Sequence, residues 1–173
     1  MKQTIHSNYS VPYMRIFVYT LLLIATLLSC VAKHKPVDKI TYNFQFYNYE
    51  NHQVDNKGVT DIENIIREFR NFPWEDQVEK MNLPDVKSNP TIGIKDHIND
   101  YDFGITAYPD NQGFGYMIYY SFKVKGVWND SFREGYTVES VEEALKLFFE
   151  RRHDELLKFL LENSKKEVGI PIF

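Results

Sequence analysis

Hydrophobic and polar positions alternate in some stretches of this chain and recur at helical spacing in others. The first alternating stretch runs from Ile40 to Phe46, and its period of two predicts a half-buried β-strand. Residues 51–58 are rich in turn formers and predict a connection. Thr60 and Glu63 then match a capping box, which predicts the start of a helix. The apolar positions that follow at helical spacing are Ile62, Ile65, Ile66 and Phe69.

From Pro90 onward the pattern changes to short alternating stretches separated by turn formers, which predicts antiparallel strands. The clearest stretch carries apolar side chains at every second position from Phe114 to Val124. Turn formers cluster at 110–113 and 128–131, and such short connections predict a meander. The strands predicted in this region are residues 91–95, 101–107, 114–124 and 132–138.

A second helix is predicted after these strands. Ser140 and Glu143 match another capping box, and apolar residues then recur at helical spacing to about Asn163. We expect one long helix, with residues 151–153 as the place where it could bend. Together the elements predict an α+β fold, an antiparallel meander of about four to five strands with helices packed on one face and a long C-terminal helix. The expected single globular domain spans residues 40–173.

Several tyrosines should lie on the sheet face that the helices leave uncovered. Tyr47 and Tyr49 have the opposite parity from the apolar positions of the first strand, and Tyr108 and Tyr119 oppose the inward sets of their strands. Tyrosine is enriched at interfaces because it is rigid, apolar in its body and polar at its tip. These four residues are therefore candidates for a binding surface. In the other interpretation they stabilise the sheet through cross-strand contacts, or further chain covers the second face.

Trp74 is a fifth candidate for that surface. It lies in Phe-Pro-Trp-Glu-Asp, where Pro73 should interrupt or restart a helix. Two aromatic residues around a proline offer contact area at small entropic cost, which suits recognition. The other interpretation, which we favour, is a core plug with Trp74 seated under the sheet.

An acidic cluster is the one candidate for metal binding. Asp96, Asp100 and Asp102 surround His97 between two predicted strands, and clustered carboxylates can hold a hard cation such as calcium. Their spacing is not that of an EF-hand loop, and acidic residues commonly form turns, so we favour a plain turn and predict no metal site. The sequence contains no nucleophile-elbow, zinc-protease, phosphate-loop or dinucleotide motif, and we predict no catalytic residue and no cofactor.

The N-terminal region has the features of a secretion signal. Residues 16–28 carry no charge, a length that suits a signal-peptide core better than a membrane span, and Arg15 precedes them. The segment Leu27-Leu28-Ser29-Cys30 then resembles the lipobox of bacterial lipoproteins, with a bulky aliphatic residue three positions before the only cysteine. The resemblance implies cleavage before Cys30, acylation of its thiol and a membrane anchor on the new N-terminus. An uncleaved anchor and an ordinary secretory signal with a chance cysteine are the alternatives.

The same resemblance implies how the chain is organised. Residues 1–29 would be the signal peptide, with Met14 as a second candidate for its start, and residues 30–39 would be a lipidated tether. Loss of Lys2 and Arg15 would change the formal net charge from −4 to −6, and such an acidic chain is a poor partner for nucleic acid. With Cys30 acylated, no thiol would remain for a disulfide, for catalysis or for zinc.

These features favour a lipid-anchored, non-enzymatic binding protein of the bacterial envelope. The order of helix, meander and C-terminal helix resembles small immunity domains of bacterial toxin systems, which implies a protein partner, a toxin acting in the periplasm. The alternatives are an accessory or structural lipoprotein of an envelope complex and an envelope hydrolase with an unrecognised site. Val31 rather than aspartate follows Cys30, which in lipoproteins favours the outer membrane. We expect the domain to face the periplasm there, with the inner membrane as the alternative.

Overall fold

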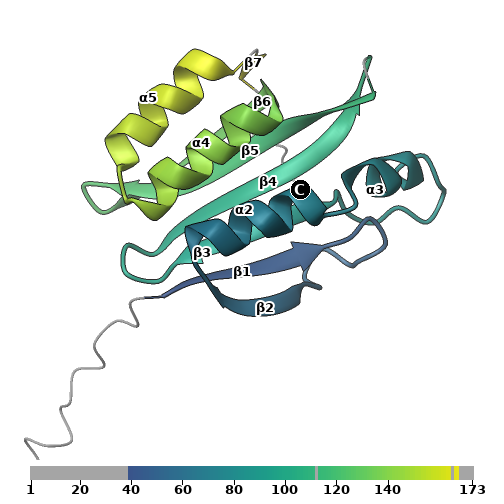
Figure 1. The fold of residues 1–173 in the computed structure, drawn as a ribbon, viewed down its shortest axis with the longest axis horizontal. Helices are drawn as coiled ribbons and strands as arrows, with labels where there is room; N and C mark the ends of the chain where they lie inside the picture. The colour runs from purple at the N-terminus through teal and green to yellow at the C-terminus, as the bar shows by residue number, and fades with distance from the viewer. Residues whose placement is uncertain (1–38, 112, 165, 168–173) are drawn as a thin grey trace, which may run out of the picture. The chain divides into compact units, whose positions relative to one another are not determined.

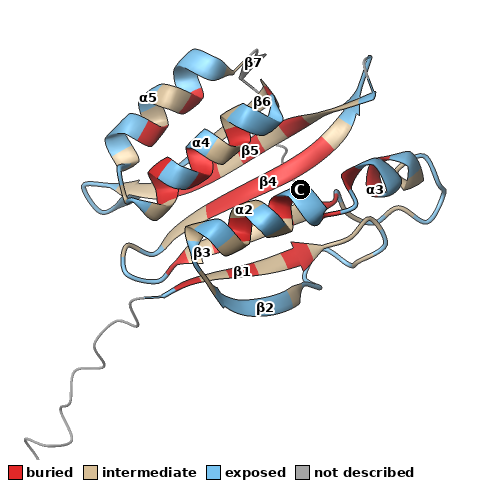
Figure 2. Ribbon diagram, viewed as in Figure 1, coloured by how far each residue is buried: buried red, intermediate tan, exposed pale blue. Residues whose placement is uncertain are grey.

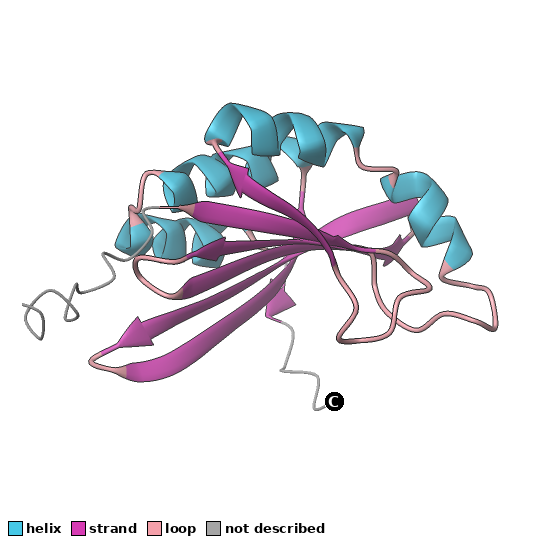
Figure 3. Ribbon diagram, turned by 90° about the horizontal axis from the view of Figure 1, so that it is seen from below, coloured by secondary structure: helices cyan, strands magenta, loops and turns pink. Residues whose placement is uncertain are grey.

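The computed structural model describes residues 39–111, 113–164 and 166–167, and these form an antiparallel sheet in the order β2-β1-β3-β4-β5-β6-β7 (Figure 1). The strands are β1 (Ile40–Gln45), β2 (Asp55–Thr60), β3 (Thr91–Asp96), β4 (Tyr101–Asp110), β5 (Gly113–Val124), β6 (Val127–Tyr136) and the short β7 (Lys166–Glu167). The described helices are α2 (Ile62–Asn71), α3 (Trp74–Lys80), α4 (Val138–Phe149) and α5 (His153–Asn163). All of these helices lie on the same side of the sheet (Figure 3).

The predicted α+β class, the antiparallel pairing and the one-sided helical layer are confirmed. The predicted number of strands is too low, because six strands have six residues or more and β7 adds two residues. The strand that the pattern misses is β2, which was predicted as a connection. Its sequence Asp-Asn-Lys-Gly-Val-Thr is largely exposed at the sheet edge, so no apolar alternation marks it.

The hairpin between β5 and β6 turns earlier than predicted. Lys125 and Gly126 form the turn with φ angles of 51° and 81°, the left-handed conformation that a type I′ hairpin turn requires at both positions. Residues 128–131, the predicted turn, belong to β6 instead. Their polar composition reflects the exposure of this part of β6 and not a change of chain direction.

The predicted long C-terminal helix is in fact two helices. The chain leaves the helical conformation after Phe149, and Arg151 has a φ of 57° before α5 begins at His153. The predicted caps are also displaced by a few residues. Thr137 caps α4 by accepting a hydrogen bond from the Ser140 amide, and Asp61 caps α2 in place of Thr60.

The hydrophobic core lies between the sheet and the helices. Figure 2 shows the buried residues along the central strands and on the sheet-facing side of the helices. Arg70 of α2 donates two hydrogen bonds of 2.5 and 2.7 Å to Glu142 of α4 and so joins two helices across the top of this core. The largest fully buried side chains include Tyr120, Phe69, Phe103, Phe148, Ile65 and Ile105. None of the described helices is long and apolar enough to cross a bilayer.

Leu145→Ala and Leu161→Ala make a matched test of this layering. Leu145 of α4 is 0% exposed and Leu161 of α5 is 57% exposed, although both lie on C-terminal helices. Removing the buried side chain should lower the free energy of unfolding by about 2–5 kcal/mol, whereas the exposed one should change it by less than about 0.5 kcal/mol. Urea unfolding of both variants measures the difference. Equal effects would contradict the placement of the core.

Candidate binding face

The side of the sheet opposite the helices is called the open face here. The strand register shows which residues lie on this face, because the side chains of residues paired across neighbouring strands point to the same side of the sheet. One row across this face is Asn43, Gly93, Gly104, Tyr119 and Phe132. Because Gly93 and Gly104 have no side chains, nothing projects from the sheet at the middle of this row. A Cβ atom on Gly93 would lie 2.8 Å from the Asn43 side-chain oxygen, so a side chain at this position would have to displace that of Asn43.

A groove of about 460 Å³ opens on this face beside that row. Residues 86–89, from the loop before β3, form one wall. Its floor combines hydrogen-bonding side chains with apolar ones, and Thr91 and Thr106 share a hydroxyl–hydroxyl hydrogen bond of 2.9 Å across β3 and β4. The residues that line the groove include Gln45, Ser88, Thr91, Thr106, Met117 and Phe132. Such a lining can donate and accept hydrogen bonds and also contact apolar groups.

Two of the predicted tyrosines, Tyr108 and Tyr119, do lie on the open face. The ring of Tyr119 packs on Phe132 with centroids 4.6 Å apart, and its hydroxyl donates to Asp130 at 3.2 Å. Tyr108 covers Gly115, where a Cβ atom would come within 2.9 Å of the tyrosine hydroxyl. Both rings are half-buried, and burial raises the pKa of each phenol above its usual value. They are therefore neutral hydrogen-bond donors at physiological pH.

The prediction for Tyr47 and Tyr49 is wrong about their place. β1 ends at Gln45, so the alternation does not extend to these residues, and they lie in the turn that follows. The Tyr47 amide donates to the Gln77 side chain at 3.2 Å, and Lys80 of α3 lies over the Tyr47 ring. Tyr49 packs edge-on against Phe46 with ring centroids 5.2 Å apart. Both tyrosines therefore belong to the end of the molecule around α3 and do not join Tyr108 and Tyr119.

Trp74 is a core residue, which excludes it from the binding surface. Its side chain is 5% exposed, and its indole Nε1 donates to the Phe69 carbonyl at 2.8 Å. Its ring packs on Phe72 and Tyr116 at centroid distances of 4.3 and 5.4 Å. Pro73 ends α2 and places this aromatic group under the sheet, as the core-plug interpretation predicts.

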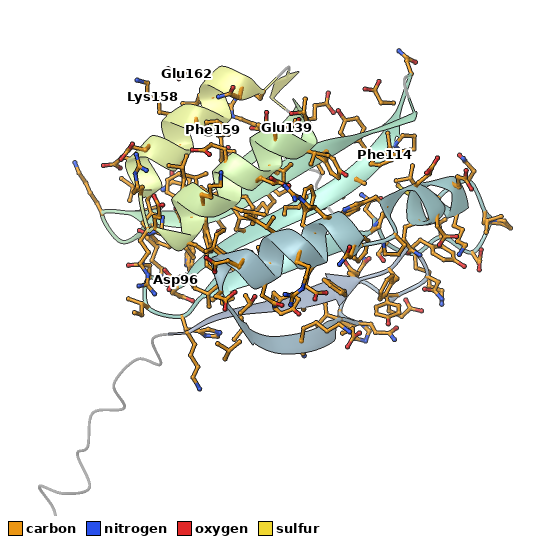
Figure 4. All side chains as sticks on the ribbon, viewed as in Figure 1. Asp96, Phe114, Glu139, Lys158, Phe159 and Glu162 are labelled. Carbon is orange, nitrogen blue, oxygen red and sulfur yellow. The ribbon has the colours of Figure 1, made fainter. Side chains whose placement is uncertain are left out.

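The acidic cluster serves the turn between β3 and β4. Asp96 lies at the end of β3, as Figure 4 shows, and its fully buried carboxylate accepts hydrogen bonds from the Ile98 amide, Asn99 and Arg151. Burial alone would raise the pKa of Asp96, but these hydrogen bonds outweigh it and hold the pKa below its usual range. Arg151 reaches this carboxylate because the chain turns sharply between α4 and α5.

The other two carboxylates of the cluster are paired with lysine. Asp100 contacts Lys95 at 2.6 Å and Lys123 at 2.9 Å, and these partners lower its pKa to about 2. Asp102 contacts Lys95 at 3.0 Å. Within the described ranges, no group of three or more potential metal ligands converges on one point. Asp96 and Asp100 therefore hold the β3–β4 turn through hydrogen bonds and ion pairs.

Sequence reasoning missed a polar contact between α5 and the sheet. The Tyr120 hydroxyl and His153 Nδ1 are 2.7 Å apart, and Asn99 approaches the other ring nitrogen at 3.4 Å. Burial lowers the pKa of His153, which favours its neutral form. Tyr120 is 0% exposed and His153 is partly buried, so the contact joins α5 to the interior of the fold. No local motif could reveal this contact, because it depends on the interruption between α4 and α5 at Arg151.

Comparison with protein-family models, with curated proteins and with solved structures yields no match to this chain. The interpretation of the open face therefore depends on its own geometry. That geometry combines a groove, two glycines on neighbouring strands and a pair of packed aromatic rings.

Asp96→Asn should lower the free energy of unfolding at pH 7 by about 2 kcal/mol, because charge-assisted hydrogen bonds to a buried carboxylate are lost. The folded-state pKa lies below the unfolded value of 3.8, so the contribution is present above that pH and is lost as the pH falls through the folded pKa. Denaturant unfolding between pH 7 and pH 3 should show the gap between variant and wild type closing only in acid.

Asp76→Asn is the control for this experiment, because Asp76 makes an exposed ion pair with Lys80 on one helix and such pairs contribute little. A gap that stays constant to pH 3, or a control variant as destabilised as Asp96→Asn, would contradict the role given to Asp96.

Proposed function

We propose that this chain is a lipid-anchored binding protein of the bacterial envelope and that its open face holds a segment of a protein partner. The observation that carries the proposal is the groove beside Met117 and Phe132. The proposal adopts the lipoprotein resemblance at Leu27-Leu28-Ser29-Cys30, which lies outside the described residues, as do the signal peptide, Met14 and residues 30–38 of the tether.

The lining of the groove supports a polypeptide as the ligand. The Gln45 amide nitrogen and the Thr91 hydroxyl already donate to carbonyl groups of the chain, but the side-chain oxygens of Gln45 and Thr106 can accept hydrogen bonds from a peptide backbone. Met117 and Phe132 offer apolar contact to its side chains, and methionine and aromatic residues are enriched at protein interfaces.

The partner that these features favour is a toxin that acts in the periplasm, with this protein as its immunity protein. The lipobox resemblance would place the domain in that compartment. The net charge of −6 after signal cleavage favours a basic partner through long-range attraction. The order of the elements, a helical segment followed by a meander and C-terminal helices, is the feature that resembles immunity domains. Stable co-purification with an envelope assembly would instead favour the accessory-lipoprotein role.

The anchor can be tested by labelling growing cells with a radioactive fatty acid. The wild-type protein should carry the label and sediment with membranes, and Cys30→Ser should lose the label because its hydroxyl cannot form the thioether that signal processing requires. Mass spectrometry of the mature N-terminus gives the site independently. A wild-type protein without label, or a Cys30→Ser protein that keeps it, would contradict the anchor.

The binding face can be tested with the protein encoded by the neighbouring gene. Wild-type protein should bind it and protect cells from it, and Met117→Arg should weaken binding by about 30-fold, the effect of losing roughly 2 kcal/mol at an interface hot spot. The dissociation constant is measured by calorimetry, and circular dichroism checks that the variant is folded.

Leu161→Arg is the matched control, because it places the same charge at an exposed apolar position of α5, on the helical side of the molecule. Equal affinity of the Met117→Arg and wild-type proteins would refute the open face as the binding site. A wild-type protein that neither binds nor protects would remove the immunity role.

A further inference from the structure

The tip of the β5–β6 hairpin exposes more apolar surface than the strands beside it. Val124, Val127 and Trp128 are 48%, 65% and 45% exposed, and Lys123 and Lys125 alternate with them along residues 123–128. We call these six residues the hairpin tip. Val124, Val127 and Trp128 belong neither to the hydrophobic core nor to the lining of the groove.

The hairpin tip lies at the end of the domain where the chain enters from its N-terminal region. The turn between β3 and β4 contacts both places. The His97 amide donates to the Lys39 carbonyl at 3.3 Å, and Asp100 pairs with Lys123 at 2.9 Å. Figure 1 shows the β5–β6 turn and the start of β1 at the same end of the sheet. Ile98, in the turn itself, adds a further exposed apolar side chain between them.

The hairpin tip carries tryptophan and lysine side chains, which are typical of membrane–water interfaces. Lys123 Nζ lies 4.3 Å from the centre of the Trp128 ring and Lys95 Nζ lies 5.9 Å from it. Tryptophan prefers the headgroup level of a bilayer, and lysine can keep its charge in water while its methylene groups lie along apolar surface. The adjacent carboxylates, Asp100 and Asp102, are both paired with lysine, which reduces their repulsion from phosphate groups.

The length of chain before the domain limits its distance from a lipid on Cys30. Nine residues lead from Cys30 to Lys39, and a fully extended chain of this length reaches about 30 Å at most. A lipid at Cys30 would therefore keep this end of the sheet within that distance of the bilayer. Such tethering raises the effective concentration of the tip at the membrane, so that a weak contact becomes occupied.

We propose that the hairpin tip inserts into the headgroup region of a phospholipid bilayer and is a second membrane contact beside the lipid anchor. This inference rests on the proposed acylation of Cys30. The contact would fix the orientation of the domain, which a flexible anchor alone does not do. Gln45 and Thr91 lie at the opposite ends of β1 and β3 from the tip, so the groove would be held away from the bilayer and accessible to a protein partner.

Tryptophan fluorescence tests the insertion, because the chain has two tryptophans with contrasting exposure. Trp128 is at the tip and Trp74 is in the core, 5% exposed. The lipidated protein is reconstituted into vesicles of phosphatidylethanolamine and phosphatidylglycerol whose acyl chains carry bromine near the headgroup. Brominated vesicles should quench a large part of the emission of the wild-type protein. Trp128→Phe should abolish the quenching, since the emission of Trp74 remains shielded by the core.

Val127→Asn should reduce the quenching of Trp128, whereas Leu83→Asn should leave it unchanged. Leu83 is 46% exposed and lies in the loop after α3, far from the tip, so it is the matched control for loss of an exposed apolar side chain. Unquenched Trp128 in protein whose lipid at Cys30 is verified by mass spectrometry would overturn the insertion and leave the anchor in place. Absence of lipid at Cys30 would overturn the anchor and, with it, this inference.

Discussion

The four described helices, α2 to α5, all pack on one face of the sheet, and most other features of the domain follow from that constraint. Side chains on the covered face are large and apolar, because burying them there is the main source of stability. Side chains on the open face must tolerate water, so polar groups, glycines and half-buried aromatic rings alternate with the core residues along the same strands. A face built in this way can bind a partner without weakening the core, because the two sets of side chains point in opposite directions.

A second constraint acts at the end of the domain where the chain enters. Asp96 joins the β3–β4 turn to Arg151, and His153 joins the start of α5 to Tyr120 of β5. Both contacts need the chain to break between α4 and α5, and the left-handed residue there is Arg151 itself. The junction therefore has two functions. It holds α5 against the sheet through the contact between His153 and Tyr120. It also stabilises the β3–β4 turn, which contacts both Lys123 of the hairpin tip and Lys39 at the start of the domain.

The fold was largely predictable from local patterns, and the candidate binding face only in part. Alternation of apolar residues identifies β1, β3, β4 and β5 because each buries one side. The same alternation does not identify β2, because an edge strand that pairs through its backbone needs no apolar pattern. Tyr119 could be assigned to the open face from its parity, whereas Tyr47 could not, because the parity argument ends where the strand ends. The groove could not be predicted, since residues 86–89 meet β4 and β6 only through the tertiary fold.

The position of Trp74 illustrates the same limit. Its sequence context is compatible with recognition or with burial, and only the packing of α2 and α3 on the sheet decides for burial. The turn at Lys125 and Gly126 was also missed, because the polar residues 128–131 that follow it predicted a later turn. Contacts between segments that are distant in the sequence cannot be predicted from such local patterns.

Amide hydrogen exchange in the presence and absence of the protein encoded by the neighbouring gene tests the central claim most directly. If the open face is the binding site, the amides of residues 86–89 and of β6 near Phe132 should exchange more slowly in the complex, while those of α4 and α5 should exchange at unchanged rates. Slower exchange confined to α4 and α5, with the rim of the groove unchanged, would contradict the account.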